Sequence, residues 1–229
     1  LNHYLERDTD SLMKRTRNRP IPAGIISPSN ALMFGILLVL SGSTLLMWKV
    51  NTLTGFLSIL TAFLYVLVYT PMKKITWLNT SIGSIPGAIP PMGGWAAATG
   101  HLDLGAWILF FIMFLWQHPH FYAIAWMCKE DYARANFKML PVIEPDGKRT
   151  IQQIFWYLSM LIPVSILPYL YGSSGFVYLS GVLILSFVFL LSAVPMAREK
   201  SNKSAKLLLK SSVLYLPGLL FLIVFDKLI

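Results

Sequence analysis

The chain has 229 residues, of which 55% are apolar and only 13% are charged, and its mean hydropathy is +0.61. An average soluble domain carries roughly 25% charged residues, so this composition excludes an ordinary soluble domain, and it is far too apolar for a disordered chain. The composition therefore indicates a membrane protein. The net charge of +9 would suit a nucleic-acid partner, but the hydropathy argues against one. The single cysteine, Cys128, excludes an internal disulfide and any multi-cysteine metal site.

Seven stretches are long and apolar enough to cross a membrane, since a spanning helix needs about 20 residues. They are residues 30–48, 53–70, 81–98, 104–126, 152–170, 176–196 and 207–225. Lipid offers no hydrogen-bond partners, so spanning segments are helices or closed barrels, and continuous apolar runs favour helices. The sequence predicts an all-α fold, a polytopic transmembrane helical bundle in a single domain over 1–229.

The connections between these stretches differ in length and charge. The long polar ones, with the N-terminal segment, are 1–29, 71–80, 127–151 and 197–206, and the short ones are 49–52, 99–103 and 171–175. Of the 19 lysines and arginines, 17 lie on the long side when the start of the last helix is included. The positive-inside rule then predicts that the long connections are cytoplasmic, or on the matrix side in a mitochondrion. We expect the bacterial cytoplasmic membrane.

Eight of the ten acidic residues share that side, and the positive-inside rule does not explain carboxylates. One interpretation is that longer loops simply hold more polar residues. The other is that carboxylates and arginines form a site on this side of the membrane.

The N-terminal segment favours a site. Asn2, Glu6 and Asp10 are spaced by four residues, so on a helix they share one face. Two stacked carboxylates repel unless a cation lies between them, and Mg²⁺ takes oxygen ligands and usually keeps a substrate phosphate. Arg15 and Arg19 follow, and a guanidinium binds phosphate oxygens bidentately. The pattern predicts a metal-dependent diphosphate site; the alternative is a solvated helix end with local ion pairs.

The run from Asn2 to Pro20 resembles the first signature of the UbiA superfamily of intramembrane prenyltransferases. Further stretches look like the branch of that family that farnesylates protoheme IX. These stretches are 69–80, 83–91, 116–123, 130–132 and 139–141. The resemblance covers essentially the whole chain. The chain departs from the family pattern at two places. Glu6 stands where aspartate is usual, and Ala135 follows Asp131 by four residues, so a second D-x-x-x-D is missing.

The resemblance implies a nine-helix fold, of which seven spans are present here. We therefore expect an N-terminally truncated chain that lacks helix one and nearly all of helix two. The implied reaction is transfer of farnesyl from farnesyl diphosphate to a vinyl group of heme b, giving heme O, with Mg²⁺ as cofactor. Membrane lipids surround such a protein, and heme A synthase is a candidate partner. The alternatives are prenyl transfer to an aromatic quinone precursor and, in another class, a membrane transporter.

The resemblance also implies roles for individual residues. The expected catalytic residues are Asn2, Glu6, Asp10, Arg15, Arg19, Lys73, Lys74 and Asp131. The expected metal ligands are Asn2, Glu6, Asp10, Glu130 and Asp131, and the expected substrate contacts are Tyr69, Asn79, His120 and Tyr132. Adjacent residues on a helix diverge by about 100°, so of Glu130 and Asp131 one is expected to bind metal and the other to pair with Lys129 or Arg134. For Lys73 and Lys74, simple anchoring at the helix end is the alternative.

Two intramembrane features stay open between packing and function. His118 and His120 flank Pro119 late in the fourth predicted span, where ionisable residues are functional candidates and histidine is a usual heme ligand. We expect His120 to contact the heme iron or a propionate; the alternative is a helix-packing hydrogen bond. The prolines of stretch 81–100 predict a helix that is kinked or broken, either for close packing or to make room for a bulky substrate.

Overall fold

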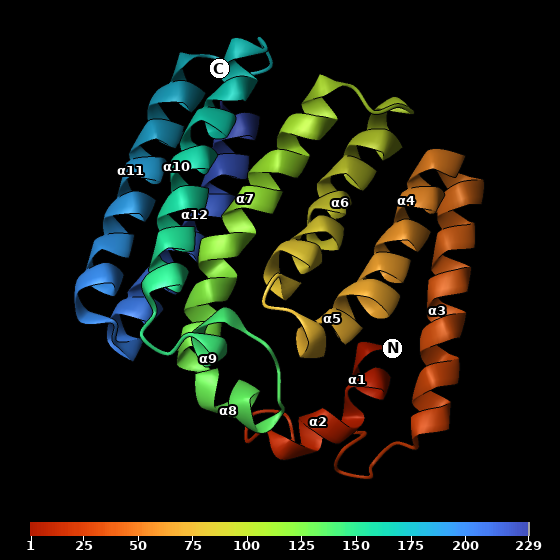
Figure 1. The fold of residues 1–229 in the computed structure, drawn as a ribbon. Helices are drawn as coiled ribbons and strands as arrows, with labels where there is room; N and C mark the ends of the chain where they lie inside the picture. The colour runs from red at the N-terminus through yellow and green to blue at the C-terminus, as the bar shows by residue number, and fades with distance from the viewer. Residues whose placement is uncertain (229) are drawn as a thin grey trace. The chain divides into compact units, whose positions relative to one another are not determined.

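The computed structural model describes residues 1–228, and within them every regular element is helical (Figure 1). The predicted all-α polytopic fold is therefore confirmed. The chain divides into two compact units. The first comprises Leu1–Leu102 and Cys128–Ile143, and the second comprises Asp103–Met127 and the chain from Glu144 onward.

The first unit holds the N-terminal signature and three long helical segments. Its elements are α1 (Asn2–Leu5), α2 (Arg7–Leu12), α3 (Pro28–Lys49), α4 (Thr52–Phe63), the π-helix η1 (Leu64–Tyr69), α5 (Thr70–Ile75), α6 (Asn79–Thr99), α8 (Lys129–Arg134) and α9 (Leu140–Ile143). Asn51 caps the N-terminus of α4, because its side chain accepts the Thr54 backbone N–H at 2.8 Å. The same side chain donates to the Ala96 carbonyl at 2.7 Å and so ties α4 to α6.

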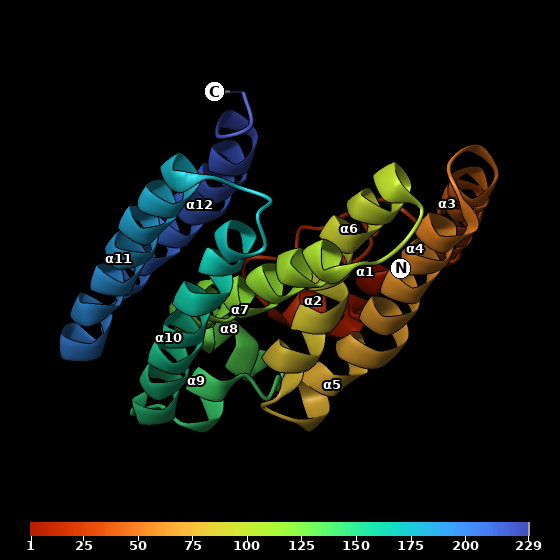
Figure 2. The ribbon, with the colours of Figure 1, turned by 90° about the horizontal axis from the view of Figure 1, so that it is seen from above.

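The second unit is a packed group of four helices. They are α7 (Leu104–Met127), α10 (Lys148–Leu170), α11 (Phe176–Glu199) and α12 (Asn202–Phe225). Helices α11 and α12 pack against each other and run side by side in the view from above (Figure 2). A buried hydrogen bond of 2.7 Å between Ser165 and Tyr215 joins α10 to α12. Asp226, just after α12, accepts hydrogen bonds from the backbone N–H groups of Gly175 and Tyr178 and so caps the N-terminus of α11.

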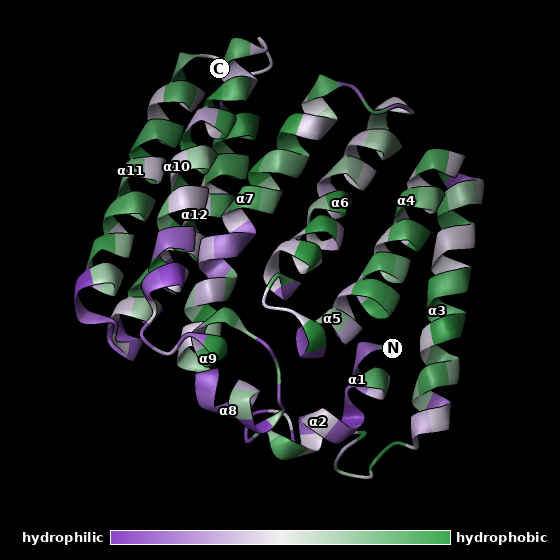
Figure 3. Cartoon of the chain, in the orientation of Figure 1, coloured by the Kyte–Doolittle hydropathy of each residue, from purple (hydrophilic) through white to green (hydrophobic). Residues whose placement is uncertain are grey.

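Six helical segments are long and apolar enough to cross a membrane: α3, the continuous run Thr52–Ile75, α7, α10, α11 and α12. The prediction of seven was therefore one too high by this measure. The remaining stretch, 81–98, does form a helix, α6, but its glycines, prolines and hydroxyl residues make it less apolar. Figure 3 shows hydrophilic residues gathered near α1, α2 and α8 in the first unit.

Helix α6 is one uninterrupted helix, although it contains Pro86, Pro90 and Pro91. A break in this helix is therefore not found, and the alternative, a kink, stays a prediction. Each proline removes one backbone hydrogen bond from α6. Helix α6 packs along α4 and η1, and prolines are tolerated in membrane helices because neighbouring helices can satisfy the freed backbone groups.

Candidate active site

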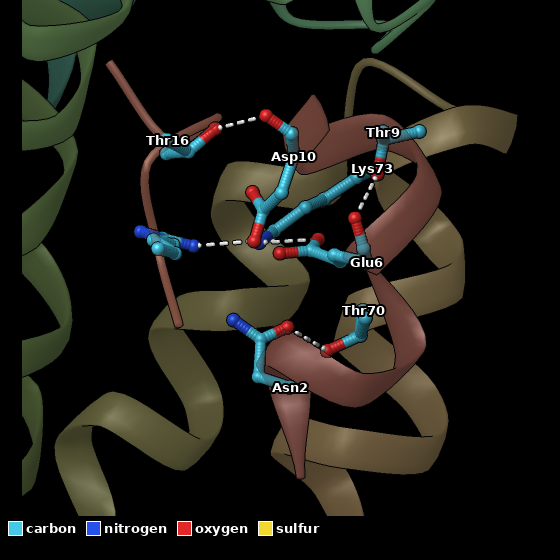
Figure 4. A network of polar contacts seen from close by, with 8 residues as sticks. Asn2, Glu6, Thr9, Asp10, Thr16, Thr70 and Lys73 are labelled. Atoms are coloured by element: carbon cyan, nitrogen blue, oxygen red, sulfur yellow. Dashed lines mark hydrogen bonds and ion pairs between the residues drawn. The ribbon is translucent and has the colours of Figure 1, made fainter. Parts of the chain in front are cut away.

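The predicted face of Asn2, Glu6 and Asp10 forms, although not on a single regular helix. Helices α1 and α2 meet at Glu6, whose backbone (φ −97°, ψ 5°) leaves the helical region. The turn nevertheless keeps the helical spacing, because the Glu6 N–H donates to the Asn2 carbonyl at 2.9 Å and the Asp10 N–H donates to the Glu6 carbonyl at 2.7 Å. The three side chains consequently point to the same side of the segment (Figure 4).

Glu6 holds the ammonium group of Lys73. Glu6 is buried, and its Oε1 lies 2.8 Å from Lys73 Nζ, while the Lys73 side chain is only 13% exposed. The ammonium also lies over the ring of Tyr69, 4.7 Å from its centroid, and 5.8 Å from the ring of Phe137. A lysine charge is thus fixed beside the acidic face by one carboxylate and two aromatic rings.

Asp10 is fully buried, and its two oxygens have different surroundings. Oδ2 lies 2.8 Å from Nη1 of Arg19. The Oδ1 atom has no hydrogen-bond partner within residues 1–228. Leaving a buried acceptor unpaired costs about 1–3 kcal/mol, so this oxygen marks a place for a cation or donor that the protein itself does not supply. Thr16 Oγ1 donates to the Asp10 carbonyl at 2.9 Å and holds the loop that carries Arg19.

The donor set at this face fits a hard divalent cation. Asn2, Glu6 and Asp10 offer one amide and two carboxylate groups, and oxygen ligands of this kind suit Mg²⁺. No group of three or more His, Cys, Asp or Glu side chains comes together in the described part of the chain. Asn2, Glu6 and Asp10 alone would therefore give an incomplete coordination shell for such a cation.

Sequence reasoning missed Thr70 as a member of this site. Its hydroxyl donates to the Tyr65 carbonyl at 2.8 Å and lies 3.2 Å from Asn2 Oδ1. The wide turn of η1 creates this arrangement, since the Thr70 backbone N–H bonds to the carbonyl five residues earlier. Such π-helical turns occur frequently at functional sites, and hydropathy gives no sign of them.

Helix α6 makes room for Tyr69. A Cβ atom at Gly83 would lie 2.5 Å from Cε2 of the Tyr69 ring. The glycine therefore permits the ring to lie against α6 while its face stays beside the Lys73 ammonium.

Asp131 organises the loop after α2. Its Oδ1 accepts the Lys14 N–H at 3.1 Å and Nη1 of Arg134 at 2.5 Å, and its Oδ2 accepts the Arg15 N–H at 3.3 Å. Glu130 is exposed, with Oε2 at 3.7 Å from Nη2 of Arg134. The expected pairing with Arg134 is thus found, but it involves both carboxylates. Metal binding by Glu130 and Asp131 stays a prediction.

Two predicted substrate contacts, Tyr132 and Asn79, also lie in the first unit. The Arg15 guanidinium lies 5.9 Å from the centre of the Tyr132 ring, and burial raises the pKa of Tyr132, so its phenol is neutral. Asn79 is fully buried, and its Nδ2 donates to the carbonyls of Thr76 at 2.6 Å and Lys138 at 3.0 Å. Both hydrogens of the Asn79 amide group are therefore used on backbone carbonyls, and the Lys138 N–H in turn donates to the Lys73 carbonyl at 2.6 Å. Contact of Asn79 with substrate stays a prediction. Lys74, in contrast to Lys73, is exposed.

Comparison with known proteins identifies the family behind this geometry. The model of the UbiA prenyltransferase family matches residues 1–215. The chain belongs to the UbiA prenyltransferase family. The resemblance inferred from the motifs is confirmed, and the protein is a prenyltransferase.

Two curated relatives of this UbiA chain are named protoheme IX farnesyltransferase. The one from Solibacter usitatus is 48% identical over 227 residues, covering 99% of this chain and 78% of the relative. The one from Salinibacter ruber is 49% identical over 226 residues, covering 99% and 80%.

Two solved structures share the fold of this UbiA chain. A digeranylgeranylglyceryl phosphate synthase gives a TM-score of 0.78 at 19% identity, covering 98% of this chain and 78% of that one. The apo structure of a UbiA homolog from Aeropyrum pernix K1 gives 0.72 at 21% identity, covering 96% and 82%. At these identities the likeness concerns the fold alone.

The two intramembrane histidines of this UbiA chain have different surroundings in the second unit. His118 is fully buried, with Nδ1 at 2.8 Å from the Phe114 carbonyl and its ring stacked on Tyr157 at 3.4 Å between centroids. His120 is partly buried, with Nδ1 at 2.8 Å from Ser212 Oγ, and its ring stacks on Trp116 at 4.8 Å. The alternative of a helix-packing hydrogen bond is therefore found for His120, whose Nδ1 joins α7 to α12, and contact of its other ring nitrogen with heme stays a prediction. The hydrogen bond of His118 to the Phe114 carbonyl stays within α7.

Proposed function

We propose that this UbiA prenyltransferase transfers the farnesyl group of farnesyl diphosphate to a vinyl group of protoheme IX and so forms heme O. The observation that carries the diphosphate chemistry is the buried Asp10, with one unpartnered oxygen and the Arg19 guanidinium on the other. The identity of the acceptor rests on relatives that are 48% and 49% identical and are named for farnesyl transfer to protoheme IX.

Asn2, Glu6 and Asp10 are the proposed holders of Mg²⁺. When bound there, the ion acts as a Lewis acid and as a template for the diphosphate oxygens. The unpartnered Oδ1 of Asp10 supports this assignment, because a metal ligand bond removes the cost of a buried oxygen without a partner. Thr70 positions the first of the three, since its hydroxyl lies 3.2 Å from Asn2 Oδ1.

Lys73 and Arg19 neutralise the leaving group in this proposal. Both cations already lie 2.8 Å from the carboxylates of the acidic face, so a diphosphate bound there contacts them without a large rearrangement. As the allylic C–O bond breaks, negative charge builds on the diphosphate, and fixed positive groups stabilise it. Arg15, held over Tyr132 by the Asp131 contacts, is a further candidate for the outer phosphate.

Farnesyl transfer forms one C–C bond and breaks one C–O bond. The vinyl π electrons of the porphyrin form a C–C bond to the allylic carbon, and diphosphate leaves with the electrons of the broken C–O bond. Water adds to the cation that remains next to the porphyrin ring and releases one proton, which leaves a hydroxyethylfarnesyl group. Exclusion of water from the allylic cation before this point prevents simple hydrolysis of the farnesyl diphosphate.

The charge distribution supports a location for this reaction. We place the site at the cytoplasmic side of a bacterial cytoplasmic membrane, because 17 of the 19 lysines and arginines lie on the side of the signature. Heme A synthase is the candidate partner that would take up the product.

Competing acceptors test the proposal directly. Membranes that contain the protein are incubated with labelled farnesyl diphosphate, Mg²⁺ and either heme b or a hydroxybenzoate. We expect label in a heme product and none in the benzoate. Label in the benzoate alone would replace the proposal by prenyl transfer to a quinone precursor, and absence of diphosphate release with either acceptor would contradict prenyl transfer by this chain.

A further inference from the structure

Ser212 connects α12 to the imidazole of His120. The Ser212 side chain is fully buried, and its Oγ lies 2.6 Å from the Leu209 carbonyl oxygen and 2.8 Å from Nδ1 of His120. These two short contacts restrict where the hydrogens can lie.

Only one arrangement of hydrogens satisfies both contacts. Two oxygen atoms 2.6 Å apart need a hydrogen between them, and a carbonyl has none, so the Ser212 hydroxyl donates to Leu209. That hydroxyl has no second hydrogen, so Nδ1 of His120 carries the hydrogen and donates to Ser212 Oγ. In the neutral ring the other nitrogen, Nε2, then keeps its lone pair. No partner of Nε2 is found in the part of the chain that the structure describes.

The orientation of the ring is fixed together with its tautomer. Trp116 stacks on the imidazole with 27° between the planes, and its Nε1 donates to the Ser212 carbonyl at 2.8 Å. Phe121 meets the ring edge-on, with centroids 5.2 Å apart. His118 differs, because its Nδ1 hydrogen bonds to a carbonyl of its own helix. The tautomer of His120 thus depends on a side chain of another helix.

We propose that Ser212 is a positioning residue that sets His120 to present the lone pair of Nε2 to the iron of the porphyrin acceptor. A histidine that binds a metal through one nitrogen usually donates the other N–H to an acceptor that fixes tautomer and ring direction. Ser212 Oγ supplies that acceptor. The inference rests on the proposed function for the identity of the acceptor, while the tautomer follows from the two distances.

The test is a ferric heme b titration of the purified protein, followed by optical absorbance and electron paramagnetic resonance. The protein is expected to show a nitrogen-ligated heme spectrum, which His120→Ala removes. Ser212→Ala and the nearly isosteric Ser212→Cys are expected to weaken heme binding by about 10- to 100-fold and to change the ligand signature. Ser211→Ala is the matched control, because adjacent residues on a helix point about 100° apart and Ser211 therefore points in a different direction from Ser212. This variant is expected to leave the heme affinity and the ligand signature unchanged.

The three possible negative results of the heme titration overturn different parts of the proposal. Full affinity and an unchanged spectrum in both Ser212 variants, with His120→Ala altered, would overturn the role of Ser212. An unchanged spectrum in His120→Ala would overturn iron ligation by His120 while farnesyl transfer to heme stands. No heme binding by the unaltered protein would overturn the inference and the proposed acceptor together.

Discussion

The adjacent lysines Lys73 and Lys74 provide a sharp test of the electrostatic account. The structure separates them: Lys73 is held by Glu6 at 2.8 Å with only 13% of its side chain exposed, whereas Lys74 is exposed. We predict that Lys73→Met lowers farnesyl transfer strongly and that Lys74→Met changes it little. Methionine keeps the unbranched stem in both variants, so the comparison isolates the ammonium group.

The expected magnitudes follow from burial. Loss of one preorganised group that stabilises transition-state charge typically costs 10²- to 10³-fold in kcat, about 2.7–4 kcal/mol, and Lys73→Met is expected in that range. The variant also leaves the Glu6 carboxylate, 7% exposed, without its cation, which should lower the free energy of unfolding by about 1.5–3 kcal/mol. An exposed charge contributes about 0–1 kcal/mol, so Lys74→Met should lose less than about fivefold.

The assay is steady-state farnesyl transfer at saturating heme b, with kcat and KM for farnesyl diphosphate measured for both variants. Thermal unfolding of each purified variant separates a loss of chemistry from a loss of folded protein. Equal losses in the two variants, or a loss below about fivefold in folded Lys73→Met, would refute the assignment of Lys73 to the leaving group.

Three further predictions concern the acidic face and its supports. Asp10→Asn keeps the shape of the side chain but removes its charge, so Mg²⁺ titration of activity should require far more metal and reach a much lower rate; an unchanged metal dependence contradicts metal binding there. Gly83→Ala places a methyl group against the Tyr69 ring, so thermal unfolding should show a loss of about 1–3 kcal/mol, and unchanged stability and activity would speak against the close contact. Backbone hydrogen bonds, chiefly from Gly175, lower the pKa of Asp226 from 3.8, so the stability it contributes is complete above pH 3.8 and is lost as the pH falls through the lowered value. Asp226→Asn should be less stable at neutral pH and lack this acid-dependent loss, whereas an identical acid profile would contradict the cap.

The sequence predicted the helices better than their ends and local irregularities. Apolar runs reveal segments that must avoid water, so each predicted span lies on a helix. The last helix was expected from residue 207 but begins at Asn202, because Ser201 and Ser204 form a polar capping box that hydropathy does not register. The π-helix η1 likewise lies inside an apolar run that a regular helix would fit equally well.

The sequence predicts the part of the site that depends on the spacing of neighbouring residues. It does not predict the contacts between residues that lie far apart in the sequence. Asn2, Glu6 and Asp10 come together because four-residue spacing survives the turn at Glu6. Of the two neighbouring lysines, Lys73 contacts Glu6 and Lys74 does not, and the sequence motif alone does not distinguish them. Thr70 and Ser212 act through residues 68 and 92 positions away, so only the folded chain reveals them.

Mass spectrometry of the heme extracted from cells that express the protein tests the central claim most directly. We predict a hydroxyethylfarnesyl heme with the unaltered protein and none with Asp10→Ala at equal protein level in the membrane. A heme pool that stays entirely heme b with the unaltered protein, while farnesyl diphosphate is consumed, would contradict the account.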